Sequence, residues 1–267
     1  MESGEGARTA GQRPIALTRE VPSSVVQCEL THLAREAIDV LRAREEHAAY
    51  EFALAELGFD VRRLAATPAL PDSVFVEDAA VVLDEIAVMT RPGAPSRRPE
   101  LPTVCEALTV LRPVRALEAP ATLDGGDVLV LDREIVVGLS ARTDRAGAEQ
   151  LARIVAPFGY RLRTVPVTAC LHLKSAVTRA AARTLVLNPV WVDAAAFPGW
   201  EIVTVDPAEP AAANVLYAAG RRVALAAEGF PRTVERLRRR GVAVRTVPAF
   251  ELARAEGGVT CCSLLLR

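Results

Sequence analysis

The stretch DVLVLDREIVVGLSARTDRAGAEQLARIVAPFG, residues 127–159, contains the unit from which we predict the fold of the whole chain. Two apolar runs, residues 127–131 and 135–137, have the length of β-strands and are separated by a short charged turn. An amphipathic helix is predicted over residues 144–156, and Gly159 provides a stop signal after it. The pattern predicts two strands and a helix, and a closing strand follows.

The same order of signals recurs along the chain with a period of roughly 50 residues, which is typical of repeated structural modules. The N-terminal unit has a long helix over residues 31–57 and a strand over residues 59–64. The other repeats are residues 74–82 and 86–90 before a helix at 99–111, residues 176–179 and 184–187 before a short segment ahead of Trp200, and residues 215–217 and 223–225 before a helix at 231–240. About five such modules predict an α/β fold built by radial repetition. A doubly wound sheet is the rival, but no Gly-x-Gly-x-x-Gly follows any first strand.

The composition is that of a soluble globular protein. The 267 residues are 51% hydrophobic and 24% charged, and the formal net charge is -1. This balance excludes a strongly basic protein that binds nucleic acid over its whole surface, and no apolar stretch is long enough to span a membrane. We expect residues 1–13 to form a flexible tail and residues 14–267 a single domain, located in the cytoplasm.

The cysteines are the first candidates for chemistry, because a thiolate is the strongest nucleophile among protein side chains. Residues 257–266, GGVTCCSLLL, place Cys261 and Cys262 after two glycines and before a C-terminal strand. Strand alternation would point the two thiols to opposite faces of a sheet. The five cysteines are too few and too unevenly spaced for a disulfide framework, so we expect reduced thiols.

Three histidines are present. His32 and His47 fall on the predicted long helix among charged neighbours, and we expect both to be exposed to solvent. His172 lies in an alternating, strand-like stretch, residues 170–175, and is the best partner for a nucleophilic cysteine. A cysteine and a histidine could also bind a metal, but two ligands make a poor site.

Two acidic clusters need an explanation. Asp72, Glu77 and Asp78 accompany an apolar run that we predict to be a strand, and Asp124 stands before two glycines. Buried carboxylates require a cationic partner or hydrogen-bond donors, so Glu77 and Asp78 predict either an internal arginine or a cationic ligand.

Six motifs, in order, closely resemble the dimethylarginine dimethylaminohydrolase family, which belongs to the guanidine-modifying superfamily of five-bladed α/β propellers. They are residues 70–82 (LPDSVFVEDAAVV), 90–98 (TRPGAPSRR), 121–127 (ATLDGGD), 137–143 (VGLSART), 171–175 (LHLKS) and 259–263 (VTCCS). The resemblance runs from about Arg19 to the C-terminus. It implies a propeller of five repeated ββαβ modules around a central active site.

The resemblance also implies roles for individual residues. Cys261 would be the nucleophile, His172 the general acid and base, and Asp124 the carboxylate that orients His172. Substrate contacts would come from Asp72, Glu77 and Asp78 to the guanidinium, from Arg97 and Arg142 to the α-carboxylate, and from Val25 on a mobile loop and the carbonyl group of Ala255.

The implied reaction is hydrolysis of Nω-methylated arginines to citrulline and dimethylamine or methylamine, through a covalent S-alkylthiouronium intermediate. It requires no cofactor and no metal, although zinc could bridge Cys261 and His172 as an inhibitor. Two alternatives remain, a hydrolase of arginine or another small guanidine, and a non-catalytic relative that binds amino acids or zinc. The expected partner is a small molecule, and the sequence leaves open whether the protein is a monomer or a homodimer.

Overall fold

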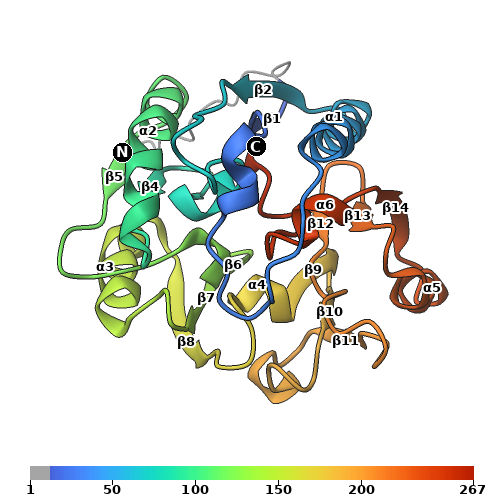
Figure 1. The fold of residues 1–267 in the computed structure, drawn as a ribbon. Coiled ribbons are helices and arrows are strands. Elements are labelled where there is room, and N and C mark those ends of the chain that lie inside the picture. The colour runs from blue at the N-terminus through green and yellow to red at the C-terminus, as the bar shows by residue number, and fades with distance from the viewer. Residues whose placement is uncertain (1–12) are drawn as a thin grey trace.

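The structure, a computed structural model, describes residues 13–267, and it arranges five three-stranded sheets around a common centre (Figure 1). The predicted α/β fold with five repeated modules is therefore confirmed. The expected tail falls on residues 1–12, which lie outside the described residues, and on Arg13.

The stretch quoted first forms one complete module. Strand β6 (Val128–Leu131) pairs antiparallel with β7 (Glu134–Leu139), and β7 pairs parallel with β8 (Arg161–Pro166). Helix α3 (Arg145–Val155) connects β7 to β8. Asp144 caps this helix by accepting a hydrogen bond from the Gly147 amide at 2.7 Å, and Gly159 follows it with φ of 81°.

The other four sheets have the same pattern, with one antiparallel and one parallel pair each. They are β3 (Ala80–Val82), β4 (Ala87–Met89) and β5 (Val114–Ala116); β9 (Val177–Ala181), β10 (Thr184–Leu187) and β11 (Glu201–Thr204); β12 (Leu216–Ala218), β13 (Val223–Ala227) and β14 (Ala243–Val247); and β15 (Leu264–Leu266), β1 (Ile15–Arg19) and β2 (Asp60–Leu64). The last sheet joins the two ends of the described chain and closes the ring.

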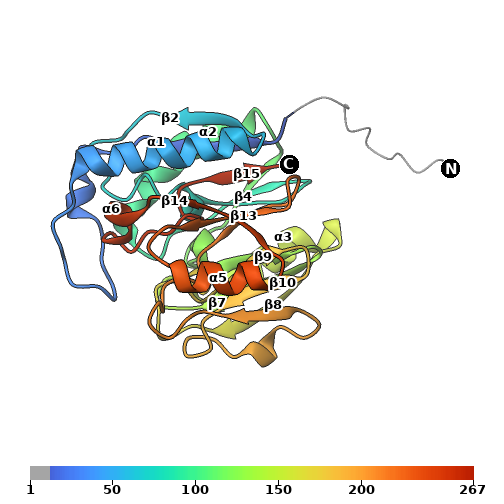
Figure 2. The same cartoon turned by 90° about the vertical axis from the view of Figure 1, so that its right-hand side faces the viewer.

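The longer helices lie outside the sheets (Figures 1 and 2). They are α1 (Val40–Glu56), α2 (Leu101–Thr109), α3 and α5 (Pro231–Arg239), whereas α4 (Leu173–Ala176) and α6 (Phe250–Ala253) are single turns. Apolar residues fill the space between each helix and its sheet, as Leu151 and Val155 of α3 do against Ile135 and Val137 of β7. No helix within residues 13–267 is both long and apolar enough to cross a membrane. The cytoplasmic location stays a prediction.

The predicted helix over residues 31–57 is wrong at its start, because the helix begins at Val40. Asp39 caps it by accepting hydrogen bonds from the amides of Leu41 and Arg42 at 3.0 and 3.1 Å. The preceding backbone is drawn away from helical geometry, since the amides of Thr31, His32 and Leu33 all donate to the carboxylate of Glu256.

The predicted strand over residues 74–82 is also wrong in its first part. Only β3 (Ala80–Val82) is a strand, and η2 (Val76–Ala79) is a turn of 3₁₀ helix. The amide of Glu77 donates to the carbonyl oxygen of Cys261 at 3.1 Å, which fixes this turn against the C-terminal segment. The side chains of Glu77 and Asp78 therefore project from a turn rather than from the face of a sheet.

His47 is buried, which corrects the expectation that it faces solvent, whereas His32 is exposed as expected. Burial lowers the pKa of His47 to about 4, and the nearby carboxylate of Glu51 only partly opposes this effect. His47 is therefore neutral at pH 7.

This burial predicts a specific loss of stability in acid. Between about pH 6.5 and about pH 4, the unfolded chain binds a proton at His47 that the folded chain does not bind, so the free energy of unfolding falls by up to roughly 3 kcal/mol from this group. Urea unfolding at pH 7.5 and pH 4.5 checks the effect. His47→Gln should lose less stability on acidification than the wild type, and the exposed control His32→Gln should match the wild type. Equal losses in all three proteins would contradict the assignment.

Candidate active site

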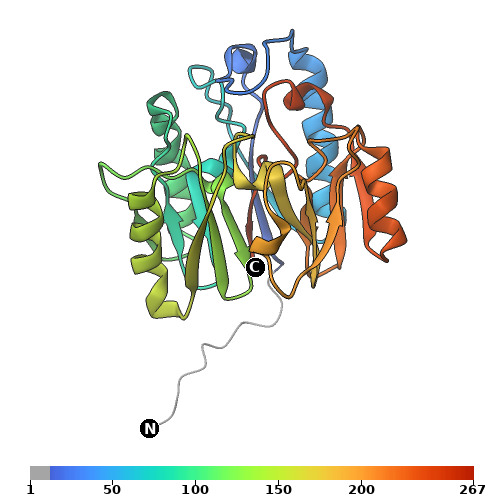
Figure 3. The same ribbon diagram turned by 90° about the horizontal axis from the view of Figure 1, so that it is seen from below.

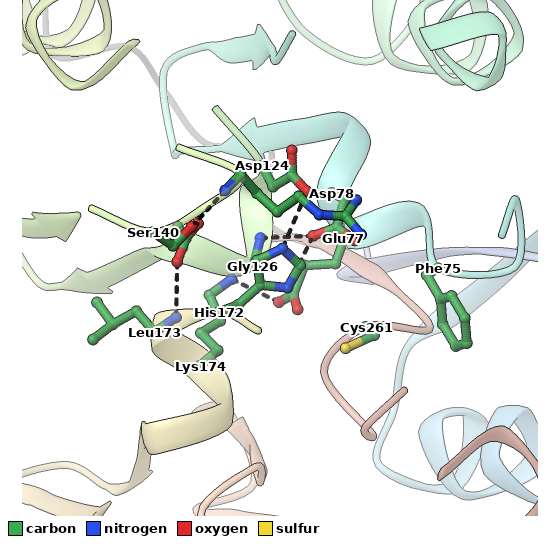
Figure 4. Close-up of polar contacts among 12 residues, drawn as sticks. Phe75, Glu77, Asp78, Asp124, Gly126, Ser140, His172, Leu173, Lys174 and Cys261 are labelled. Atoms are coloured by element: carbon green, nitrogen blue, oxygen red, sulfur yellow. Dashed lines mark hydrogen bonds and ion pairs between the residues drawn. The ribbon is translucent and has the colours of Figure 1, made fainter. Parts of the chain in front are cut away.

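Three turns that are distant in the sequence bring the predicted site residues together (Figure 4). The 3₁₀ turn η2 carries Glu77 and Asp78, η4 (Gly125–Asp127) follows Asp124, and α4 follows His172. The segment that follows β1 lies at the end of the molecule opposite the C-terminal residue (Figure 3). The side chains of these site residues are each less than a tenth exposed, namely Glu77, Asp78, Asp124 and His172.

Asp78 is the most strongly bound of these acids. Its Oδ2 atom accepts a hydrogen bond from Arg97 Nη1 at 2.5 Å, and its Oδ1 atom accepts one from the Gly126 amide at 2.9 Å. Burial raises the pKa of Asp78, but the charges of His172 and Arg97 outweigh burial and lower the pKa below its usual value. Asp78 is therefore an anion at neutral pH.

His172 is held between two carboxylates. Its Nε2 atom lies 3.1 Å from Asp124 Oδ2, and its Nδ1 atom lies 3.8 Å from Asp78 Oδ1. Burial lowers the pKa of His172, but the carboxylates of Asp78, Asp124 and Asp127 outweigh burial and raise the pKa to about 9. The imidazole is accordingly protonated at pH 7. The backbone of His172 leads into the helical turn α4, so the strand predicted at this position is wrong.

Asp124 has the geometry expected of a residue that orients His172. It is fully buried, and its second oxygen accepts a hydrogen bond from the Gly93 amide at 2.8 Å. The hydroxyl of Thr143 in turn accepts a hydrogen bond from the Asp124 amide at 3.1 Å. These contacts fix the carboxylate independently of the imidazole.

Asp127 also supports the imidazole, and sequence analysis missed it. Its carboxylate accepts hydrogen bonds from Ser140 Oγ at 2.6 Å and from the Leu173 amide at 2.9 Å. Because Leu173 is the first residue of α4, these bonds fix the turn from which His172 projects. The signal was present as a second acid directly after the two glycines, but that pattern is also common in ordinary turns.

Glu77 pairs with a residue that the sequence analysis did not single out. The Nζ atom of Lys174 donates to one oxygen of Glu77 at 2.6 Å, and Thr260 Oγ1 donates to the other at 2.7 Å. Lys174 is the one lysine in the chain, and this rarity among many arginines was the signal that could have marked it.

Cys261 lies in a turn before β15, so the predicted strand alternation does not apply to it. Its partly exposed thiol accepts a hydrogen bond from the Gly258 amide at 3.4 Å, and the sulfur points to the side on which Glu77 and His172 lie (Figure 4). Burial, together with the charges of Glu77 and Asp78, raises the pKa of this thiol to about 12. The thiol is therefore protonated at pH 7.

Cys262 has different surroundings. It is 5% exposed, packs in an apolar cluster, and its sulfur donates to the carbonyl oxygen of Gly258 at 3.7 Å. Burial raises its pKa well above the ordinary value. The two neighbouring thiols thus face different environments, but the prediction that they lie on opposite faces of a strand is wrong, because both residues belong to a turn.

Arg97, to which the resemblance assigned the substrate α-carboxylate, is bound by several groups of the protein. Its buried guanidinium donates to Asp78, to both oxygens of Glu100 at 3.0 and 3.1 Å, and to the carbonyl oxygens of Asp72 and Phe75. All three guanidinium nitrogens already have protein partners. Arg97 therefore binds Asp78, and Glu100, which sequence analysis missed, binds Arg97. The contact of Arg97 with a substrate carboxylate stays a prediction.

The other predicted substrate contacts surround this centre. Both oxygens of buried Asp72 accept hydrogen bonds from the Glu29 amide, at 3.2 and 3.1 Å, and Arg142 Nη2 donates to Thr31 Oγ1 at 3.1 Å. Burial raises the pKa of Asp72, and the nearby positive charge of Arg142 offsets only part of this increase. Arg142 is thus a partly exposed cation near the acids.

Val25 and Ala255 lie in the same apolar core cluster. Val25 belongs to the 3₁₀ helix η1 (Ser23–Gln27) and has no exposed surface, so the expected position on a loop is corrected. Ala255 is 4% exposed and donates its amide hydrogen to the Leu252 carbonyl at 3.0 Å. Their contacts with substrate stay predictions.

One group of described residues could hold a metal ion. Ligand atoms of Asp78, Asp124 and His172 lie within 4.8 Å of one another. All three are already engaged in the hydrogen bonds given above. The predicted inhibitory zinc at Cys261 and His172 uses a different pair of residues and stays a prediction.

Comparison with known proteins identifies the family. The family model for N,N dimethylarginine dimethylhydrolase, eukaryotic, matches residues 26–190. The N(G),N(G)-dimethylarginine dimethylaminohydrolase of Streptomyces coelicolor is 39% identical over 254 residues, covering 94% of this chain and 96% of the relative. The chain belongs to the dimethylarginine dimethylaminohydrolase family. It is therefore a hydrolase of that type.

Solved structures agree with this assignment. The family member from Pseudomonas aeruginosa, a cysteine-to-serine mutant complexed with citrulline, superimposes with a TM-score of 0.90 at 31% identity, covering 95% of this chain and 99% of that one. The N-terminal domain of the cyanobacterial arginine dihydrolase ArgZ has a TM-score of 0.83 at 17% identity, covering 95% and 98% of the two chains. The second similarity shows the shared fold alone.

Gly126 allows a sharp test of how His172 is held in this family member. A β-carbon at this position would lie 2.6 Å from His172 Nδ1 and 2.8 Å from Asp78 Oδ1, which is closer than van der Waals contact allows. Gly126→Ala should displace the imidazole from its carboxylates and lower the pKa of His172 from about 9 towards its ordinary value, at a cost in stability of about 1–3 kcal/mol. NMR titration of the imidazole measures the shift. Gly220→Ala, where an added β-carbon meets nothing within 4 Å, is the control. An unchanged pKa in Gly126→Ala would contradict the geometry.

Proposed function

We propose that this protein hydrolyses Nω-methylated arginines, namely asymmetric dimethylarginine and monomethylarginine, to citrulline and dimethylamine or methylamine. The observation that carries the proposal is a cysteine thiol whose pKa is raised by burial and by the carboxylates of Glu77 and Asp78, and whose sulfur points to the side on which the protonated His172 lies. Family membership supports the same reaction.

The acids suit a planar cationic substrate. A guanidinium group is stabilised by resonance and is a poor electrophile, so it must be held rigidly while a nucleophile approaches its central carbon. Glu77 and Asp78 offer negative charge on the side to which Cys261 points, and Asp72 adds a third carboxylate nearby. Arg142 is the partly exposed cation that we assign to the α-carboxylate, because a forked guanidinium matches that group.

The protonation states of Cys261 and His172 define what substrate binding must change before the thiol can react. In the free protein the thiol of Cys261 is neutral and His172 is protonated, so the imidazole cannot accept the thiol proton. Glu77 and Asp78 contribute to the high pKa of the thiol, and a bound guanidinium cation would offset their charge. We infer that substrate binding lowers the pKa of Cys261 and that the proton leaves to solvent.

The chemical steps follow from these states. The thiolate sulfur forms a bond to the guanidinium carbon, and the protonated His172 gives its proton to the departing amine as the carbon–nitrogen bond breaks. Neutral His172, oriented by Asp124, then removes a proton from water, and the resulting hydroxide attacks the S-alkylthiouronium carbon. Breaking the carbon–sulfur bond returns the cysteine and releases citrulline.

A citrulline assay tests this function and distinguishes the two thiols. We expect citrulline from asymmetric dimethylarginine, with much slower formation from arginine. Cys261→Ser should lower kcat at least 1000-fold because the hydroxyl is a far weaker nucleophile, whereas Cys262→Ser should keep a substantial part of the activity. No citrulline from any methylated arginine would contradict the proposed function, and equal losses in the two variants would contradict the choice of nucleophile.

The pH dependence of alkylation tests the state of the thiol without turnover. Because the pKa of Cys261 is about 12, its reaction with iodoacetamide should accelerate up to pH 10 without reaching a plateau. Glu77→Gln should raise the rate several-fold at pH 8, since it removes a charge that disfavours the thiolate. Mass spectrometry of the Cys261 peptide measures both effects, and Glu106→Gln on exposed α2 is the control. A plateau below pH 9 in the free protein would contradict the account.

A further inference from the structure

A cavity of about 360 Å³ reaches Cys261 from a side that none of the predicted substrate-binding acids lines. It lies between the residues before α4, the loops of the sheets β9–β11 and β12–β14, and the segment of residues 32–33. Its lining is mainly apolar and includes Leu33, Leu171, Trp191, Phe230 and Val259. Cavities of roughly 300 Å³ and more can bury sizeable ligands, so this space far exceeds what two methyl groups need.

Several polar groups of this lining, those of Glu256, Asn214 and Cys170, are already hydrogen-bonded within the protein, and the side chains of His32 and Ser175 complete the polar part of the lining. The carboxylate of Glu256 accepts hydrogen bonds from the amides of Thr31 at 3.1 Å and of His32 and Leu33 at 2.5 Å. Glu256 is the one lining residue with a carboxylate, and no arginine or lysine lines the cavity.

The lining amide and one lining thiol are engaged as well. The side chain of Asn214 bonds to the amide and hydroxyl of Thr260 and to the carbonyl oxygen of Lys174, and Cys170 donates to the carbonyl oxygen of His172 at 3.3 Å. The cavity therefore offers apolar surface and no free charged pair for the amino-acid end of a substrate.

The position of the cavity relates it to the leaving group. It touches the nucleophile Cys261 and also Leu171, which directly precedes the proton donor His172. The nitrogen that departs must face His172 to receive its proton, and it is bound to the carbon that Cys261 attacks, so a substituent on that nitrogen is directed towards Leu171 and Cys261, which both line the cavity. Glu77 and Asp78, the acids assigned to the guanidinium, are not among the lining residues.

We propose that this cavity binds the substituent of the departing nitrogen, and that the protein hydrolyses guanidines whose Nω group is an apolar chain or ring larger than methyl, such as butyl or benzyl. This inference rests on the proposed function. For Nω-butylarginine the carbon–nitrogen bond breaks as the carbon–sulfur bond forms, butylamine takes the proton of His172, and water restores the thiol and yields citrulline.

Turnover of a matched pair of substrates tests the proposal. Each methylene transferred from water into an apolar cavity can favour binding by up to roughly fourfold. We expect kcat/KM for Nω-butylarginine to equal or exceed that for Nω-monomethylarginine, and any value above one tenth of it supports the proposal. A lower value, with normal turnover of monomethylarginine, overturns it.

A variant that fills the cavity locates the binding site. Ala211 is an exposed lining residue, so Ala211→Leu adds bulk to the cavity without disturbing the core. It should lower the ratio of the butyl to the methyl kcat/KM at least fivefold. Ala195→Leu, at an exposed position outside the cavity, should leave that ratio unchanged. An unchanged ratio in Ala211→Leu overturns the proposal.

Alkylation separates failure of this inference from failure of the proposed function. If the wild type makes no citrulline from monomethylarginine, the proposed function fails, and the cavity is tested by the reaction of Cys261 with N-benzyliodoacetamide relative to iodoacetamide. Ala211→Leu should lower this ratio at least fivefold if the cavity binds apolar groups next to the thiol. An equal ratio in both proteins overturns the cavity site.

Discussion

The buried carboxylate of Asp78 is the constraint on which the rest of the site depends. An anion inside a protein is stable only if cations and hydrogen-bond donors surround it, and here Arg97, the Gly126 amide and His172 do so. The same carboxylate raises the pKa of His172, and it adds to the effects of burial and of Glu77 that raise the pKa of Cys261, so one charge influences the proton state of both groups. Removing a partner from such a cluster leaves an uncompensated charge, which explains why Glu100 is needed behind Arg97.

The ring of sheets is what brings these groups to one place. The acids, the imidazole and the thiol come from four different parts of the sequence, and the sheets on either side of each turn fix its position. The pairing of β1 with β15 joins the first described strand to the strand that follows Cys261, so the thiol is placed only when the ring is closed. The fold thus serves as a rigid support for short turns, which carry the chemistry.

The sequence was sufficient where local signals decided the structure. The module at residues 127–159 was predictable because its strands, its helix cap at Asp144 and its stop at Gly159 are all local. The start of α1 was not predictable, because the carboxylate of Glu256, more than 200 residues away in the sequence, binds the backbone amides of residues 31–33. The residue types of the site were visible as a cysteine, a histidine and clustered acids. The hydrogen bonds that Arg97 donates to Glu100 and Asp78 were not visible in the sequence, because they depend on the folded arrangement of these residues.

The proposed reaction requires that the sulfur of Cys261 becomes covalently bound to the guanidine carbon of the substrate. Rapid acid quench of the wild-type protein with asymmetric dimethylarginine, followed by peptide mass spectrometry, tests it most directly. We expect an adduct on Cys261, and none on Cys262, that decays as citrulline accumulates. Its added mass should equal the mass of asymmetric dimethylarginine minus the mass of dimethylamine. Citrulline formed at the full rate with both cysteines unmodified at every time point would contradict it.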